Sequence, residues 1–338
     1  MNTEILSTHT PQLFSEAVAR AVALLCAGAV VALPTETVYG LAANALDEKA
    51  VAKIFQIKGR PAHNPLIVHV AGQTMARRCV SEFPLLAEKL SRAFWPGPLT
   101  LVLPGAEQIP ANVTAGGRTV AIRWPAHPFI QAVIRGCDFP LAAPSANLSN
   151  RISPTNADHV RAQLAGQIPL IVDGGQSQVG IESTVLDLTV SPPAILRPGM
   201  IHAESLAAVT GALADSADQL KGGLRSPGQL PKHYSPKARL WVLDWEDEEA
   251  LRARIATLGV NPGGVQILAH TRIPSGEHFA GVSVIPHDAE AFARALYAEL
   301  HRCDETGVAG IIVEKPPDLP EWAGINDRLR RASAGFGV

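Results

Sequence analysis

Several features are scarce or missing in this sequence of 338 residues. Only 5% of the residues are aromatic, and the four cysteines lie far apart, with no Cys-x-x-Cys pair. Such spacing gives no zinc signature and favours a reducing compartment over a disulfide framework. The first residues lack a basic-then-apolar leader pattern, and no apolar run approaches the ~20 residues of a membrane-spanning helix. We therefore expect a soluble, cytoplasmic protein.

The common catalytic motifs are also missing. The sequence contains no Gly-x-x-x-x-Gly-Lys-Ser/Thr loop, no Gly-x-Gly-x-x-Gly after the first expected strand, and no Gly-x-Ser-x-Gly turn. A P-loop, a dinucleotide-binding fingerprint and a serine-hydrolase elbow are thereby disfavoured. If the protein handles phosphates, side-chain cations must do so.

Charge is unevenly distributed along a chain whose net charge is only −2. Residues 1–215 hold 15 Lys and Arg against 15 Asp and Glu, residues 216–240 hold 5 against 1, and residues 241–338 hold 9 against 15. A length of 338 residues favours two domains, at roughly 150 residues each. A short basic segment thus joins a neutral domain to an acidic one.

The hydrophobic pattern predicts helices and strands that interleave without strict alternation. This order favours an α/β fold with a twisted mixed sheet and helices against it, over residues 1–215. Residues 216–237 contain Gly222-Gly223, Pro227-Gly228, Pro231 and Pro236, which are typical of an extended linker. Residues 238–338 predict a small second α/β domain.

The first candidate motif is the polar segment after the strand expected at residues 29–33. Thr35, Glu36, Thr37 and Tyr39 follow this strand directly and precede Gly40. Polar side chains at the end of a buried strand are held rigidly and suit a binding site. A tight strand-to-helix turn with capping hydroxyls is the structural alternative.

The second candidate motif is Lys58-Gly-Arg60, at the end of a helix that Asp47 should cap and Gly59 should end. Two cations so close repel each other unless an anion lies between them. Arginine offers a planar fork for phosphate and lysine a mobile point charge. The alternative is a pair of cations that merely stabilises a helix C-terminus.

The third candidate motif is Ser145-Ala-Asn147, in a turn after a short strand. The serine hydroxyl and the asparagine amide are spaced to bond the phosphate or ribose of a nucleotide. An ordinary turn built on side-chain hydrogen bonds would explain the same residues without a function.

Together these motifs resemble the YrdC-type family. Pro34-Thr-Glu-Thr-Val-Tyr-Gly-Leu41, Lys58-Gly-Arg60 and Ser145-Ala-Asn147 occur in the family's order, and the Lys-x-Arg and Ser-x-Asn pair marks the threonylcarbamoyl-AMP synthases. Arg197-Pro-Gly199 and the segment from Ser226 to Pro236 are similar to two-domain members with an interdomain linker and a Rossmann-like C-terminal domain. The linker departs from the family at Gln229 and Ser235, where Met and Ala would be expected.

The resemblance implies a nucleotidyltransferase that makes threonylcarbamoyl-AMP and pyrophosphate from L-threonine, bicarbonate and ATP. It implies Mg²⁺ as a companion of ATP, held by phosphates and water rather than by protein ligands. Lys58, Arg60, Ser145 and Asn147 would be the catalytic residues. The ATP contacts implied by the resemblance are Lys58, Arg60, Asn64, Thr119, Ser145, Asn147, Ser153, Arg197, His233 and Tyr234. The threonine contacts are Thr37, His69, Arg123, Ala143 and Ser183.

Two other readings remain. One is an RNA-binding module without catalysis, which the neutral first domain and the few aromatics disfavour. The other is a carbamoyl-transferring domain of the hydrogenase-maturation kind, whose usual acylphosphatase and zinc-finger segments are missing from this sequence. The resemblance implies a downstream tRNA threonylcarbamoyl transferase as partner, with neither membrane association nor stable binding of nucleic acid. The role of the acidic C-terminal domain stays open.

The linker generates the first testable prediction. If residues 216–237 form a lid, their positive charge favours closure over a polyphosphate, and Tyr234 covers the bound nucleotide. Truncation after Ala214 should then weaken ATP affinity and slow turnover, as measured by ATP titration and a steady-state assay. Unchanged values in the truncated protein would contradict the lid.

Overall fold

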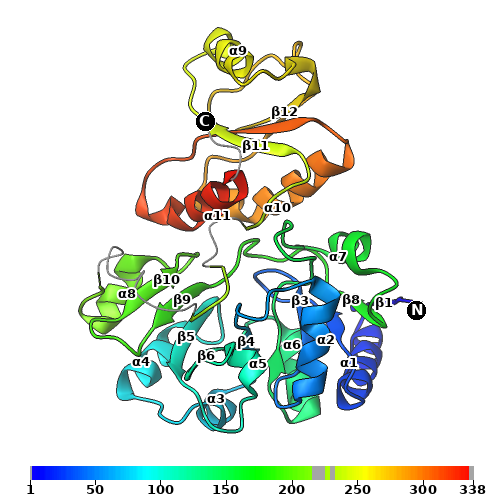
Figure 1. Ribbon diagram of the computed structural model, residues 1–338, viewed down its shortest axis with the longest axis vertical. Coiled ribbons are helices and arrows are strands. Elements are labelled where there is room, and N and C mark those ends of the chain that lie inside the picture. Colours follow the sequence, from blue (N-terminus) through cyan, green and yellow to red (C-terminus); the bar gives the residue numbers. More distant parts are fainter. Residues whose placement is uncertain (1, 215–224, 229–232, 335–338) are drawn as a thin grey trace. The chain divides into compact units, whose positions relative to one another are not determined.

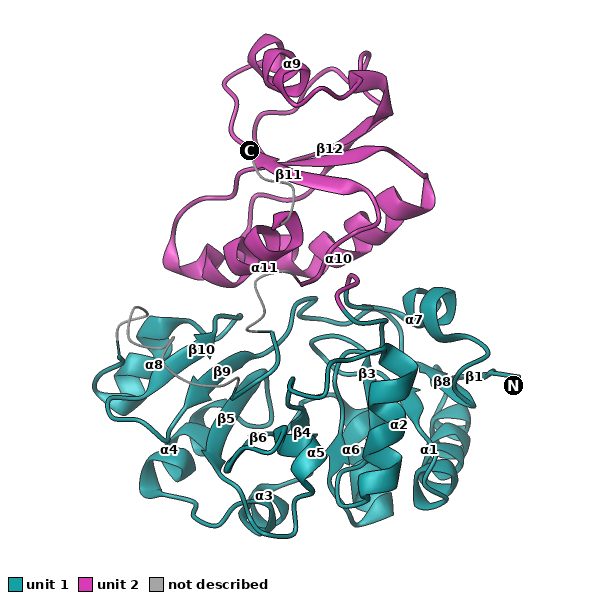
Figure 2. Cartoon of the chain, viewed as in Figure 1, with its two compact units in different colours: residues 1–149, 153–229 teal, residues 150–152, 230–338 magenta. Residues whose placement is uncertain are grey.

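The computed structural model describes residues 2–214, 225–228 and 233–334, which fall into two compact units (Figure 2). Unit 1 comprises residues 1–149 and 153–229, and unit 2 comprises residues 150–152 and 230–338. After residues 150–152, which group with unit 2, the chain returns to unit 1, and it leaves unit 1 for good inside the segment that the sequence predicts as a linker. Residues 216–224 and 229–232 of that segment lie outside the described residues. None of the described helices is both long and apolar enough to cross a membrane.

Unit 1 is built on a mixed sheet of ten strands, in the order β1-β8-β2-β3-β7-β4-β6-β5-β9-β10 (Figure 1). Neighbours such as β4 and β6 run parallel, whereas β2 and β3 run antiparallel. The predicted fold class is thereby confirmed. The strands are β1 Glu4–Ser7, β2 Val31–Leu33, β3 Gly40–Asn44, β4 Ile67–His69, β5 Leu99–Pro104, β6 Thr119–Arg123, β7 Leu141–Ala142, β8 Leu170–Asp173, β9 Thr184–Asp187 and β10 Ala194–Arg197.

Helices α1 and α2 of unit 1 begin at capping residues that the sequence reveals. The Thr10 hydroxyl accepts from the Leu13 backbone N–H and caps α1, and Asp47 caps α2 in the same way. Gly59 ends α2 in the left-handed conformation, with φ +58°. The helices are α1 Pro11–Cys26, α2 Glu48–Lys58, α3 Gln73–Cys79, α4 Leu85–Phe94, α5 Ala111–Thr114, α6 Pro128–Cys137, α7 Ala157–Leu164 and α8 Ala203–Thr210.

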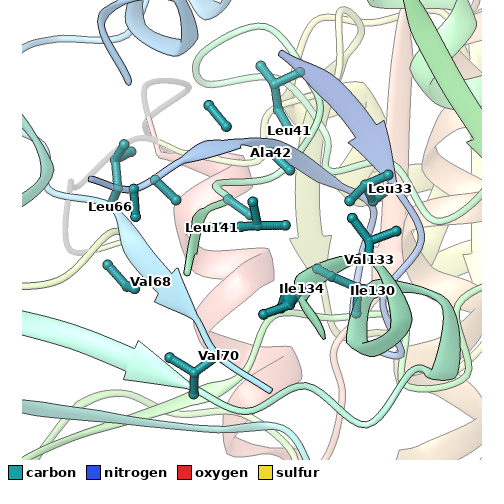
Figure 3. Packing of buried hydrophobic residues seen from close by; sticks show 14 of the residues in the cluster. Leu33, Leu41, Ala42, Leu66, Val68, Val70, Ile130, Val133, Ile134 and Leu141 are labelled. Carbon is teal, nitrogen blue, oxygen red and sulfur yellow. The ribbon is translucent and has the colours of Figure 1, made fainter. Parts of the chain in front are cut away.

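The two faces of the sheet are packed differently. One face forms the large core, in which α6 packs beside the central strands (Figure 3), and Phe14 of α1 meets Phe129 of α6 edge to face at 5.3 Å. The other face carries a small cluster made only of strand residues, namely Ile67, Val102, Ala121 and Val185. Side chains alternate between faces along a strand, so His69, Arg123 and Thr100 share this second face.

Some elements are not predicted from the sequence. The segment from Thr35 to Tyr39 connects the antiparallel strands β2 and β3, so its interpretation as a strand-to-helix turn is wrong. β3 reads Gly-Leu-Ala-Ala-Asn, without a β-branched residue, and is recognisable as a strand only from its pairing. Helix α3 follows Gly72, which provides no side-chain cap, so its start carries no signal either.

Unit 2 is a parallel four-stranded sheet in the order β11-β14-β12-β13, with a hydrophobic core of its own. It confirms the expected small Rossmann-like α/β domain. Its elements are β11 Arg239–Leu243, α9 Glu248–Thr257, the 3₁₀ turn η2 Pro262–Gly264, β12 Val265–Ala269, β13 Gly281–Val284, α10 Ala289–Glu305, β14 Gly310–Glu314, the 3₁₀ turn η3 Pro320–Trp322 and α11 Ala323–Ser333.

Gly199 allows the chain after β10 to approach the start of β9 closely. A Cβ at Gly199 would lie 2.6 Å from the Thr184 backbone nitrogen and 2.8 Å from the Glu182 carbonyl oxygen. Because both neighbours are backbone atoms, they cannot turn away as a side chain would. This close approach holds Arg197, at the end of β10, beside Ser183.

Gly199→Ala should therefore destabilise unit 1. We expect the free energy of unfolding to fall by about 1–3 kcal/mol, the usual cost of overpacking, in urea unfolding followed by fluorescence and circular dichroism. Gly72→Ala is the matched control, because a Cβ there would meet no atom within 4 Å. Equal stability of the two variants would show that the backbone at Gly199 can relax.

Candidate active site

The first and third motifs of the sequence lie side by side. The Tyr39 carbonyl accepts a hydrogen bond of 2.8 Å from the Ala146 backbone N–H, and Gly40 forms an isolated bridge with Ser145. The same loop has a second backbone contact, in which the Thr37 carbonyl accepts from the Gly180 N–H at 3.1 Å. The polar loop after β2 is thus held by backbone contacts.

The second motif is bonded directly to the third. Lys58 is 2% exposed, and its Nζ donates to the backbone oxygens of Ser145 and Asn147, both at 2.6 Å, and to the Asn147 Oδ1 at 3.3 Å. Burial and the neighbouring Arg60 guanidinium hold the pKa of Lys58 well below its usual value, while Glu182 acts in the opposite direction. The Lys-x-Arg and Ser-x-Asn signatures are therefore two halves of one hydrogen-bonded cluster.

Arg60 organises the loop that follows it. Its Nε donates to the Asn64 carbonyl at 3.0 Å and its Nη2 donates to the Pro65 carbonyl at 2.7 Å. Asn64 is only 1% exposed, and neither Nδ2 nor Oδ1 of its side chain has a hydrogen-bond partner within the described part of the chain. A buried amide with no partner is costly, so it is well suited to bond a ligand.

Arg123 and His69 are neighbours across β4 and β6, where their Cα atoms are register partners. Arg123 is 3% exposed and donates from Nη2 to the Glu36 Oε1 at 2.6 Å, from Nη1 to the Thr37 hydroxyl at 2.9 Å and from Nε to the Gly97 carbonyl at 3.2 Å. Burial, reinforced by the Arg123 charge, lowers the pKa of His69 to about 3. The ring is therefore neutral, and its Nδ1 has no partner among the described residues.

Ser183 and Arg197 form a second buried cluster. The Arg197 Nε donates to the Ser183 carbonyl and its Nη2 to the Ser183 hydroxyl, both at 3.1 Å. The same hydroxyl lies 2.8 Å from that of Thr100. The resemblance assigned Arg197 to ATP and Ser183 to threonine, and the structure places the two in direct contact.

The remaining predicted residues of unit 1 occupy defined positions. Ser153 is fully buried and donates to the Glu182 Oε1 at 2.5 Å, and the Ala143 N–H donates to the Ile67 carbonyl at 3.1 Å. Thr119 begins β6 and Arg123 ends it, on the same face. Four residue steps along the strand place them about 13 Å apart, so they would contact different parts of the bound ligands.

His233 and Tyr234 belong to unit 2. The His233 N–H donates to the Arg331 carbonyl at 3.2 Å, and the Tyr234 ring lies 5.9 Å from the Tyr297 ring and 5.2 Å from the Arg328 guanidinium carbon. Their assignment to ATP stays a prediction. Within the described residues, no group of three or more His, Cys, Asp and Glu side chains is arranged to hold a metal ion.

Sequence reasoning named Glu36 within the first motif without giving it a ligand, and it missed two further residues of the site, Glu182 and Thr100. Glu36 pairs with Arg123, Glu182 accepts from Ser153, and Thr100 contacts Ser183. Glu182 and Thr100 carry no local signal, because only the pairing of β5 with β9 brings Thr100 beside Ser183.

Comparison with known proteins shows which family each part of the chain resembles. Residues 23–199 match the family described as "Telomere recombination" (Sua5, YciO and YrdC), and residues 201–334 match the "Threonylcarbamoyl-AMP synthase, C-terminal domain". The fold is also that of E. coli YciO, with a TM-score of 0.52 and 23% identity over 59% of this chain and 96% of that chain. The chain is thus a two-domain protein of the Sua5 type.

Relatives that match over most of the chain identify the family more closely. The chain is 42% identical to the threonylcarbamoyl-AMP synthase of Pyrococcus abyssi, over 90% of this chain and 91% of the relative, and 41% identical to that of Bacillus subtilis, over 98% and 96%. The crystal structure of P. abyssi Sua5 complexed with L-threonine matches with a TM-score of 0.88 and 37% identity, over 98% of both chains. The chain belongs to the threonylcarbamoyl-AMP synthase family.

The neutral state of His69 leads to a prediction about pH. The unfolded chain takes up a proton at His69 below its ordinary pKa of 6.5, whereas the folded chain does so only near pH 3. Stability from this group is therefore present above pH 6.5 and is lost progressively as the pH falls towards 3. When the pH falls from 6.5 to 5, the free energy of unfolding of the wild type should therefore fall by up to about 2 kcal/mol more than that of His69→Gln.

Urea unfolding at pH 7.5, 6.5 and 5.0 measures this difference. His63→Gln, which removes an exposed histidine of the same unit, is the matched control. If stability changed with pH equally in the wild type and in His69→Gln, His69 would take up its proton at the same pH in the folded and the unfolded protein, which contradicts the prediction.

Proposed function

We propose that the protein condenses L-threonine, bicarbonate and ATP into threonylcarbamoyl-AMP and pyrophosphate, for the threonylcarbamoyladenosine modification of tRNA. The observation that carries this proposal is the Lys58 contact with Ser145 and Asn147, which joins the two signature motifs of the synthases. The names of the full-length relatives and the threonine complex of P. abyssi Sua5 support it further.

ATP would occupy the side of the site that holds the cations. Arg60 and Lys58 would face its phosphates, the unpartnered Asn64 amide would bond a phosphate oxygen, and the other predicted contacts would surround the nucleotide. Mg²⁺ would enter as part of the substrate, on the phosphates and water, because the described residues offer no cluster of three protein ligands for it. The remaining predicted ATP contacts of unit 1 are Thr119, Ser145, Asn147, Ser153 and Arg197.

Threonine would lie where β4 and β6 end. Arg123 would pair its carboxylate, and the neutral His69 and the Thr37 hydroxyl would bond its polar groups. Ser183 and the backbone at Ala143 would complete this end. Thr119 lies on the same face at the opposite end of β6, so the nucleotide and the amino acid would contact opposite ends of one sheet surface.

The chemistry needs no nucleophile from the protein. The threonine amine takes up bicarbonate with loss of water, and the carboxylate so formed attacks the α-phosphate of ATP and displaces pyrophosphate. Catalysis would then rest on positioning and on stabilisation of the charge that develops on the phosphate. Lys58 and Arg60 suit this task because backbone acceptors hold them before any ligand arrives.

The described residues 225–228 of the linker support the proposed lid. The Arg197 Nη1 donates to the Pro227 carbonyl at 3.3 Å, so the described residues 225–228 lie against a residue expected at ATP. Arg225 also pairs with Asp187 at 2.7 Å. Residues 216–224 and 229–232 of the lid lie outside the described residues, and the lid stays part of the proposal.

The product is an activated carbamate, so an acceptor enzyme must consume it. We assign this step to a tRNA threonylcarbamoyl transferase, in keeping with the proposed reaction. Stable binding of RNA by this chain is not part of the proposal, since its net charge is −2 and non-specific RNA binding depends on excess positive charge. Strongly salt-dependent RNA binding without ATP turnover would favour the RNA-binding alternative.

Pyrophosphate release tests the proposal. The purified protein with Mg-ATP should release pyrophosphate only when L-threonine and bicarbonate are both present, and mass spectrometry should detect threonylcarbamoyl-AMP. Lys58→Ala and Arg60→Ala should each slow release by about a hundredfold or more, as loss of a charge-stabilising group does. Lys53→Ala, which removes an exposed lysine of the same helix, should not. Release without threonine would contradict the proposed reaction.

A further inference from the structure

The site contains a buried ion pair that the proposed contacts use only in part. Glu36, in the loop between β2 and β3, is 7% exposed, and Arg123, at the end of β6, is 3% exposed. Their charged groups meet at 2.6 Å through the Glu36 Oε1 and the Arg123 Nη2. The resemblance assigns Arg123 to the threonine carboxylate and gives Glu36 no role.

The second oxygen of Glu36 is without a partner. Oε2 is buried and makes no hydrogen bond to any of the described residues, although the Ala126 backbone N–H approaches the carboxylate. Burial raises the pKa of Glu36, but the Arg123 charge and the neighbouring backbone dipoles outweigh it, and the pKa lies below its usual value. The group is therefore an anion with one oxygen unsatisfied.

Such an oxygen is unfavourable by itself, because a buried acceptor without a donor loses its hydration without compensation. A ligand that brings a positively charged N–H donor would remove this cost. The groups that face Glu36 are compatible with such a ligand, since His69 is neutral, Thr37 is a hydroxyl, and Arg123 already balances the carboxylate. The local sum of charges is zero.

We infer that Glu36 is a specificity-determining residue that accepts the α-ammonium group of the amino acid through Oε2, while Arg123 pairs the α-carboxylate. A buried Glu–Arg pair is the complement of a zwitterion, because each charge of the ligand meets one of opposite sign. A ligand without the ammonium group leaves Oε2 unpaired, and the site rejects it for that reason. This inference rests on the proposed function, which supplies threonine as the ligand.

The test compares two ligands that differ only in the amine. L-threonine and (R)-3-hydroxybutyrate share the carboxylate and the hydroxyl, and isothermal titration of the full chain measures the affinity of both. The wild type should prefer threonine by about tenfold to a hundredfold, the range for one charged hydrogen bond. Glu36→Gln should lose that preference by weakening threonine alone. Glu88→Gln, which disrupts a carboxylate–arginine pair of unit 1 outside the site, should keep it.

Three outcomes overturn the inference. Equal affinity of the wild type for the two ligands does so without any variant, so a poorly folded Glu36→Gln protein does not leave the question open. Equal weakening of both ligands by Glu36→Gln shows that Glu36 acts only by holding Arg123. If the wild type binds no threonine at all, the proposed function fails together with this inference, and the other two outcomes leave that function intact.

Discussion

Burying the Lys58 ammonium costs several kcal/mol unless its three hydrogens find acceptors, and the structure meets this demand with atoms from a distant part of the chain. Two backbone carbonyls and one side-chain amide of the turn after β7 accept from Nζ, while the Lys58 carbonyl accepts from the Ser149 N–H at 2.8 Å. The end of α2 and this turn therefore define each other's position. The first motif is fixed to the same turn through Tyr39 and Gly40. Hence the geometry of all three motifs depends on one buried cation.

This dependence explains why the motifs look ambiguous one at a time. Lys58 at a helix C-terminus has a structural reading, and so has a serine- and asparagine-rich turn. Part of the expected local structure is present, since Gly59 does end α2 and Asn147 does donate to the Leu148 carbonyl beside it. The sequence does not show that the Ser145 and Asn147 carbonyls of this turn accept hydrogen bonds from Lys58. Function and local structure are here served by the same atoms.

Local signals predicted the fold well, and long-range pairing limited the prediction of the site. Helix α2 could be delimited from Asp47 and Gly59, because a cap and a left-handed glycine act within one turn. The contact of His69 with Arg123 depends on the register of β4 against β6, which no local pattern encodes. Only the resemblance named both residues for one ligand. The resemblance gives Glu36 no role. The feature that distinguishes Glu36, an oxygen without a partner among the described residues, is visible only in three dimensions.

The charges of the site are compensated before any ligand binds, and this has a consequence for catalysis. Arg123 is balanced by Glu36, Lys58 by carbonyl dipoles, and Arg60 by the carbonyls of Asn64 and Pro65. Because folding has already oriented these groups, they need little rearrangement when charge develops on a phosphate. A site of this kind selects ligands by contact, and the unpaired atoms of Asn64, His69 and Glu36 are then the ones that decide which ligand fits.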